Sequence, residues 1–284
     1  MTSPHLKAVI FDVGGVVCRS PLIAIAAYER KHGLPSNYIN CSITRRGHNG
    51  AWQKFERGEI PLFPFYEAFG RELSDTDSGN QWYREYCQRK GIECPPLPKD
   101  LNINGRELFG RMMRESATFD ERMVEAIRRL RGETAARWRV IALTNNFSKT
   151  GAAIVGQDST PRNAHPDARA AIQSELAFLG WEQGATPQKL RELFDDFCDS
   201  SEFGMRKPEP EFYLLACQRN NIKPREAVFL DDLGMNLKTA QQLGMETIHV
   251  PIGGSLIALR QLEAKLGIDL TSGFEPTEWI PSKM

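Results

Sequence analysis

A short apolar run near the amino terminus ends in one acidic residue. Residues 8–11 read Ala-Val-Ile-Phe, and Asp12, Val13, Gly14 and Gly15 follow them. An apolar, partly β-branched run of this kind is typical of a strand buried on both faces, as the strands of a parallel sheet are. The glycines place little side chain beside the carboxylate of Asp12, so a ligand can approach it. The sequence therefore predicts a buried strand that delivers a carboxylate into an open turn.

Similar apolar runs return late in the chain, at residues 139–144, 227–231 and 246–250. Helical patterns lie between the later runs, for example at residues 120–131 and 209–220. This alternation of strand and helix predicts an α/β fold with a parallel sheet covered by helices on both faces. Because ligands of such sheets bind at the carboxyl ends of the strands, polar residues at those ends are the candidate site residues.

The first two predicted strands are separated by a long interval with a different pattern. Residues 19–116 contain helical stretches broken by glycines and prolines, without a comparable apolar strand. We expect them to form a helical cap, inserted into a core made of residues 1–18 and 117–284. Residues 151–184 include a turn-rich, non-periodic stretch and are expected to be a surface insertion within that core.

Charge and hydropathy exclude several classes of partner. The 284 residues include 36 basic and 36 acidic side chains, so the chain has no overall field that would hold a nucleic acid or an anionic membrane. Uncharged apolar stretches stay well below the roughly 18 residues of a membrane span. The expected partner is therefore a small molecule, and a homodimer is left open.

Cysteine usage and the chain ends bear on the compartment. The six cysteines have no C-x-x-C spacing, which favours reduced intracellular thiols over disulfides or a zinc site. The first strand begins too early for a cleavable signal peptide, so a cytoplasmic protein is expected. Ser282-Lys283-Met284 differs by one conservative change from the peroxisomal S-K-L signal, which keeps the peroxisome as an alternative.

Polar residues follow the later strands in a fixed order. The segments are Thr144-Asn145-Asn146, then Gly204 to Pro210 with Lys207 at its centre, then Asp231-Asp232. Taken singly, a Thr-Asn pair or a Lys-Pro pair is most often a cap, a turn or a solvated charge. Two adjacent acids are harder to explain in this way, because they repel each other unless a cation lies between them. The whole set, at one edge of one sheet, predicts a magnesium-dependent phosphoryl-transfer site.

Phosphoryl transfer needs a nucleophile and cations that neutralise the phosphate. The Asp12 carboxylate can attack phosphorus and form an aspartyl-phosphate. Mg²⁺ prefers oxygen ligands, which Asp12, the Gly14 carbonyl and Asp232 can supply with Asp231 beside them. Without the metal, Asp12 would repel its own substrate.

Three further residues can bind the phosphate directly. Lys207 offers a positive charge that can hold both Asp12 and a phosphate oxygen. The Thr144 hydroxyl and the Asn145 amide can donate hydrogen bonds to the remaining oxygens.

The four segments resemble the four motifs of the haloacid dehalogenase superfamily, most of whose members are phosphatases. They are residues 11–16, 143–146, 204–210 and 230–236. The resemblance covers nearly the whole chain and is closest to the branch that contains the amino-terminal phosphatase domain of soluble epoxide hydrolase. It implies a Rossmann-like core with a helical cap, to which Arg46 to Gly50 and Arg57 to Ile60 would belong. The roles that it implies are nucleophile for Asp12, phosphate binding for Thr144 and Asn145, charge neutralisation for Lys207, Mg²⁺ binding for Asp232, and support of the metal loop for Asn236.

One position departs from the family pattern. The phosphatases of the family usually carry a second Asp, the general acid and base, where this chain has Gly14. Loss of such a group costs about 10²–10⁴ in rate. His48 of the predicted cap is a candidate replacement, because glycines surround it and histidine exchanges protons near neutral pH. Its alternative interpretation is a surface loop residue.

The favoured function is a magnesium-dependent phosphatase of a small phosphomonoester, slow or selective for good leaving groups because of Gly14. A carbon-halogen hydrolase would also use Asp12 but would have no use for Asp231 and Asp232. A protein that only binds a phosphorylated ligand or a protein partner is favoured by Gly14 and disfavoured by the intact acids and Lys207. A phosphomutase would depend on the acid that position 14 lacks.

Overall fold

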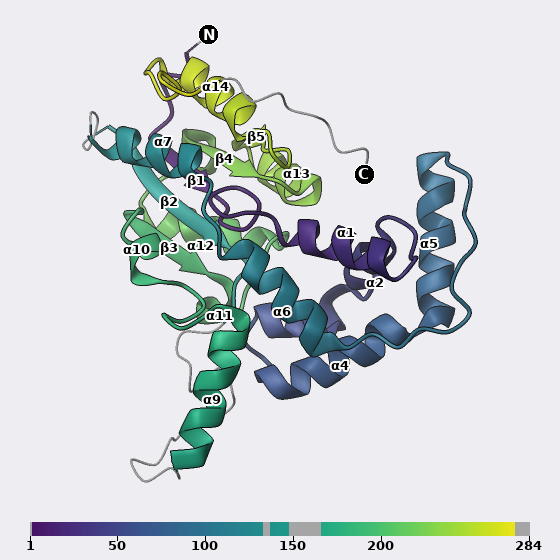
Figure 1. Cartoon of the computed structure of the whole chain (residues 1–284). Helices are drawn as coiled ribbons and strands as arrows, with labels where there is room; N and C mark the ends of the chain where they lie inside the picture. Colours follow the sequence, from purple (N-terminus) through teal and green to yellow (C-terminus); the bar gives the residue numbers. More distant parts are fainter. Residues whose placement is uncertain (1, 133–136, 148–165, 276–284) are drawn as a thin grey trace. The chain divides into compact units, whose positions relative to one another are not determined.

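A computed structural model describes residues 2–132, 137–147 and 166–275 (Figure 1). The carboxyl-terminal Ser282-Lys283-Met284 and residues 151–165 of the predicted insertion lie outside the described residues. The chain forms two compact units. The sheet unit consists of Met1–Ser20, Ser116–Asn146 and Thr186–Lys283, and the helical unit consists of Pro21–Glu115 and Phe147–Ala185.

A single five-stranded sheet lies at the centre of the sheet unit. Its order is β3-β2-β1-β4-β5, and every neighbouring pair is parallel. The strands are β1 (Ala8–Phe11), β2 (Arg139–Thr144), β3 (Asp196–Asp199), β4 (Ala227–Asp231) and β5 (Glu246–His249). This confirms the predicted parallel α/β fold. Strand β3 was not predicted, because only two of its four residues, Phe197 and Cys198, are apolar.

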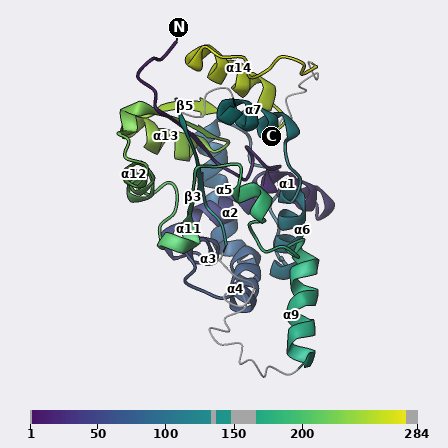
Figure 2. The same ribbon diagram turned by 90° about the vertical axis from the view of Figure 1, so that its left-hand side faces the viewer.

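Helices cover both faces of this sheet. Side chains of α7 (Glu121–Gly132) and α14 (Ser255–Leu266) pack in one hydrophobic cluster with Val9 and Phe11. The alternate strand residues Ala8 and Ile10 pack in a second cluster with α12 (Pro210–Arg219) and α13 (Gly234–Gln242). Because successive strand side chains point to opposite faces, a fully apolar β1 requires both layers. Figure 2 shows α12 and α13 on one side of the strands and α7 on the other.

The strand register brings the candidate residues to one edge of the sheet. Phe11 lies opposite Ala142 of β2 and Leu230 of β4, so Asp12 emerges beside the ends of both neighbours. Thr144 pairs with Asp199 of β3. The remaining short elements of this unit are α10 (Gln188–Arg191), α11 (Ser200–Phe203) and η2 (Pro224–Glu226).

The helical unit has an aromatic core. Its elements are α1 (Pro21–Lys31), α2 (Tyr38–Arg45), η1 (Gly47–Asn49), α3 (Ala51–Glu56), α4 (Leu62–Ser74), α5 (Thr76–Lys90), α6 (Gly105–Ser116) and α9 (Pro166–Leu179). Within its described residues no strand occurs, as the helical pattern of residues 19–116 predicts. The buried rings of Phe55, Phe65, Phe109 and Phe147 stack or meet edge to face at centroid distances between 4.2 and 5.6 Å.

The segment after residue 146 groups differently from the prediction. Phe147 and the described residues 166–185 belong to the helical unit, whereas residues 151–184 were expected to form a surface insertion of the core. The reason is that Leu179 and Trp181 are buried in the aromatic core, and the buried Glu175 of α9 binds Arg106 of α6 at 2.8 Å. Among the described helices none is both long and apolar enough to cross a membrane.

Candidate active site

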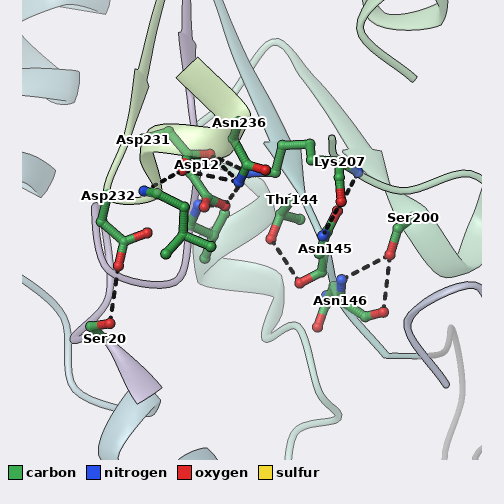
Figure 3. Close-up of polar contacts among 12 residues, drawn as sticks. Asp12, Ser20, Thr144, Asn145, Asn146, Ser200, Lys207, Asp231, Asp232 and Asn236 are labelled. Carbon is green, nitrogen blue, oxygen red and sulfur yellow. Dashed lines mark hydrogen bonds and ion pairs between the residues drawn. The ribbon is translucent and has the colours of Figure 1, made fainter. Parts of the chain in front are cut away.

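Lys207 joins two aspartates that come from different strands (Figure 3). Its Nζ lies 2.8 Å from Oδ1 of Asp12 and 2.8 Å from Oδ2 of Asp231. All three side chains are buried, and the lysine is only 1% exposed. Burial lowers the pKa of Lys207, but the charges of Asp12 and Asp231 outweigh it, so the pKa is raised and the ammonium stays charged. The loop before α12 thus places one cation between the ends of β1 and β4.

Asp231 is held on both of its oxygens. Oδ1 accepts from the backbone N–H of Leu233 at 2.7 Å, and the Asn236 amide donates to Oδ1 and Oδ2 at 3.1 Å each. Asn236 is fixed in turn, because the Tyr213 hydroxyl donates to its carbonyl at 3.0 Å. Asn236, at the start of α13, therefore holds both oxygens of the Asp231 carboxylate.

Asp232 lies against two residues that follow β1 in the chain, Gly15 and Ser20. Ser20 donates its hydroxyl to Oδ2 of Asp232 at 3.0 Å. Gly15 has a φ of +84°, and a Cβ added there would lie 2.1 Å from Oδ2 of Asp232. The glycine turn after Asp12 is thus needed for two reasons: a positive φ and room for the second acid. The sequence offered no local sign of Ser20, which meets Asp232 only through the fold.

The three aspartates form a group that fits a divalent cation. One oxygen from each of Asp12, Asp231 and Asp232 lies within 4.8 Å of the other two. Burial and the neighbouring charge of Asp231 raise the pKa of Asp232 to about 7. Burial is also the largest cause that raises the pKa of Asp12, against the opposing charge of Lys207. Clustered acids with an all-oxygen donor set suit Mg²⁺, which takes carboxylates and waters.

Thr144 and Asn145 follow β2 beside this group. The Asn145 side chain binds the backbone of Lys207 twice, since Oδ1 accepts from its N–H at 2.8 Å and Nδ2 donates to its carbonyl at 3.0 Å. The Thr144 hydroxyl donates to the carbonyl of Asn145 at 3.4 Å, a long bond that a ligand can replace. The predicted phosphate-binding pair therefore lies next to Lys207, and one of its members is already bonded to the lysine backbone.

Gly14 and His48 have different surroundings. Gly14 forms an isolated parallel β-bridge with Cys18 in the turn after β1. Gly14 is not among the glycines with a positive φ. His48 lies in η1 of the helical unit, where its side chain is exposed and its carbonyl accepts from Arg57 at 2.7 Å. The other predicted site residues all belong to the sheet unit.

Comparison with known proteins decides the family. Residues 6–244, most of the chain, match the haloacid dehalogenase-like hydrolase family. The chain belongs to this family. The resemblance drawn from the four segments is thereby confirmed, and the protein is a hydrolase of the haloacid dehalogenase type.

Curated relatives of this hydrolase include parts of larger proteins. Bifunctional epoxide hydrolase 2 of Mus musculus is 46% identical over 278 residues, which make up 98% of this chain and 42% of the relative. Acyl-CoA dehydrogenase family member 10 of Mus musculus is 30% identical over 98% of this chain and 21% of the relative. The chain thus spans less than half the length of these two. A match over most of both chains is the sesquiterpene phosphatase astK of Aspergillus oryzae, 24% identical over 90% of this chain and 96% of the relative.

Proposed function

We propose that this haloacid dehalogenase-like hydrolase is a magnesium-dependent phosphatase that acts on a small phosphomonoester through an aspartyl-phosphate. The observation that carries the proposal is the group formed by Lys207 and the three clustered aspartates, with Asp12 at the end of the central strand. Relatives that are named phosphatases, such as the one from Aspergillus oryzae, support it.

Asp12 is the proposed nucleophile. Its Oδ1 accepts from the N–H of Val13 at 2.6 Å and from Lys207 at 2.8 Å. These two bonds fix the carboxylate plane and leave Oδ2 as the oxygen that attacks phosphorus. Burial raises the pKa of Asp12, and the charge of Lys207 opposes this effect and favours the ionised form that attacks phosphorus.

The same edge of the sheet can hold the metal and the phosphate. Asp12, Asp232 and the Gly14 carbonyl are the proposed Mg²⁺ ligands, with Asp231 beside them as the acid that Lys207 and Asn236 orient. Bound Mg²⁺ would neutralise phosphate oxygens that Asp12 otherwise repels. Thr144 can turn its hydroxyl to the phosphate, and the Asn145 amide has a second hydrogen besides the one that it gives to Lys207.

A second candidate function is favoured by Gly14. Without an acid at this position, the protein could bind a phosphorylated ligand and turn it over very slowly. The proton would then have to come from elsewhere, for which His48 of the helical unit remains the candidate. A carbon-halogen hydrolase has no use for the adjacent acids Asp231 and Asp232, so we place it last.

The test combines a panel of phosphate esters with an Asp12→Asn variant. The parent should hydrolyse at least one ester in Mg²⁺ and none in a chelator, and Asp12→Asn should be inactive while still binding inorganic phosphate. Beryllium fluoride, which mimics an aspartyl-phosphate, should be captured by the parent only. The matched control is Asp196→Asn at the amino end of β3, which removes a carboxylate paired with Arg219 at 2.7 Å. Phosphate binding without turnover of any ester would favour the second candidate, and activity retained in Asp12→Asn would contradict both.

A further inference from the structure

The turn that follows β2 is bonded from a neighbouring strand that the candidate site does not include. Asn146 donates its backbone N–H to Oγ of Ser200 at 2.9 Å, and the same Oγ donates to the Asn146 carbonyl at 3.2 Å. Ser200 is the first residue of α11, directly after β3, and is fully buried. One hydroxyl therefore serves both backbone groups of Asn146 (Figure 3).

Asp199 holds the side chain of the same residue. The Asn146 amide donates to Oδ2 of Asp199 at 2.9 Å, and it also bonds the Thr186 hydroxyl. Asp199 ends β3 opposite Thr144, and its side chain is completely buried. The backbone and the side chain of Asn146 are thus fixed by consecutive residues of one strand end.

Asp199 is itself held rigidly. Its Oδ1 accepts from the N–H of Ser201 at 3.0 Å and from the Ser201 hydroxyl at 2.7 Å. Arg191 lies 3.8 Å from Oδ2 and supplies a partly exposed positive charge. A buried carboxylate near an anion site opposes anion binding by its charge, so electrostatics does not explain its place there. The place of Asp199 is explained instead by its hydrogen bond to the Asn146 side chain.

We propose that Ser200 and Asp199 are positioning residues that hold the turn of residues 144–146 in the conformation that binds phosphate. The turn is fixed at Asn145 by the Lys207 backbone and at Asn146 by the end of β3. The Thr144 hydroxyl, which donates to the Asn145 carbonyl, is therefore followed by two anchored residues. A binding group that is already in place loses less freedom when its ligand arrives. This proposal rests on the proposed function, since it assigns phosphate to that turn.

Ser200→Ala tests the proposal with little risk to the fold, because it removes one oxygen and adds nothing. Both backbone groups of Asn146 lose their partner, so we expect the affinity for inorganic phosphate in saturating Mg²⁺ to fall about 10-fold by calorimetry. The affinity for Mg²⁺ should stay within about two-fold, since Asp12 and Asp232 keep the contacts described above. A merely structural loss would not separate the two ligands in this way.

Ser74→Ala is the matched control. The Ser74 hydroxyl also donates to a carbonyl, that of Gly70 at 2.7 Å, and accepts from a backbone N–H, that of Ile103 at 2.8 Å, all within the helical unit. The Ser74→Ala variant should lower the melting temperature about as much as Ser200→Ala and leave the affinity for phosphate unchanged. If both variants bind phosphate as the parent does, the positioning role is wrong while the proposed function stands. If the parent itself binds no phosphate in Mg²⁺, both are overturned.

Discussion

At the scale of single residues, the site depends on one lysine shared by two acids. Lys207 is almost completely buried, and a buried ammonium is stable only when it is paired. Asp12 and Asp231 supply that pairing at equal distances of 2.8 Å. Asp232 contacts the Ser20 hydroxyl instead, and it is the one acid of the three that is only partly buried.

Asp232→Asn should separate metal binding from stability. The variant should bind Mg²⁺ at least about 10-fold more weakly in a calorimetric titration, because the metal loses a charged ligand. In a chelator its melting temperature should equal or exceed that of the parent, because the repulsion between Asp231 and Asp232 is relieved. The exposed Asp100→Asn serves as the control and should change neither quantity. Parent-like Mg²⁺ affinity in Asp232→Asn would show that this acid is not a ligand.

Gly14→Asp should alter the choice of leaving group. A missing general acid slows esters of basic alkoxides most, so the parent should prefer aryl and acyl phosphates to alkyl phosphates. The new carboxylate should narrow this preference by about 10-fold or more, measured as the ratio of kcat/KM values. Position 14 is not among the positive-φ sites, so φ at this position does not strain a side chain. If the ratio does not move in a folded variant, His48→Ala in the parent would show whether that histidine already supplies the proton.

The sequence predicted those residues of the candidate site that stand directly at the ends of recognisable strands. Asp12, Thr144 and Asp231 end or follow apolar runs, and parallel strands bring such ends together. Ser20, Asp199 and Ser200 were missed because their partners lie far away in the chain: Ser20 meets Asp232 across 212 positions and Ser200 meets Asn146 across 54. Such contacts follow from the fold and leave no local pattern.

At the scale of elements, β1 could be recognised from the sequence and β3 could not. Strand β1 lies at the centre of the sheet and is apolar throughout, so its residues alone predict a buried strand. Strand β3 is an edge strand that begins and ends in aspartate, and both aspartates bond to residues outside the strand. Helix α9 was expected in a surface insertion, yet Glu175, Leu179 and Trp181 are buried in the helical unit. A polar residue is buried there because its partners, on α4 and α6, are close only in the fold.

Glu175→Ala should loosen α9 from α6. Glu175 accepts from Arg106 at 2.8 Å and from the buried Tyr66 hydroxyl at 2.8 Å, and the variant would leave that hydroxyl without this partner. We expect a loss of about 1–3 kcal/mol in the free energy of unfolding, together with faster amide exchange in residues 170–181. Glu107→Ala is the control, because its pair with Arg111 on α6 is partly exposed and should cost less than about 0.5 kcal/mol. Unchanged exchange in α9 would contradict the anchoring role of Glu175.

At the scale of the whole molecule, two acids with a raised pKa, one in each unit, predict a stability that depends on pH. Glu29 accepts from the backbone N–H groups of Asn37 and Ile39 at 2.9 and 2.8 Å, yet burial raises its pKa from 4.5 to about 7. Asp232 has a pKa raised from 3.8 to about 7, mainly by burial. A pKa that is higher in the folded state favours folding while the acid is protonated, and this contribution is lost as pH rises through the folded value.

In a chelator, the free energy of unfolding should therefore fall between about pH 4.5 and pH 7 by on the order of 1–3 kcal/mol. Urea denaturation at several pH values measures it. Asp232→Asn and Glu29→Gln should each make the free energy of unfolding depend less on pH, because each variant removes one titrating carboxyl group. Saturating Mg²⁺ should restore stability at pH 7 in the parent but not in Asp232→Asn. A free energy that rises over this interval would contradict both assignments.

The parallel register of β1, β2 and β4 also limits how this chain can change in length. Phe11 lies opposite Ala142 and Leu230, so Asp12 meets its partners only while the three strands keep their residue counts. Removing one residue from a strand would shift its terminal side chain by about 3.3 Å and turn every earlier side chain to the opposite face. Both faces are packed by helices, so neither could accept the exchanged set without rearrangement. These strands can therefore exchange one apolar residue type for another far more readily than they can gain or lose a residue.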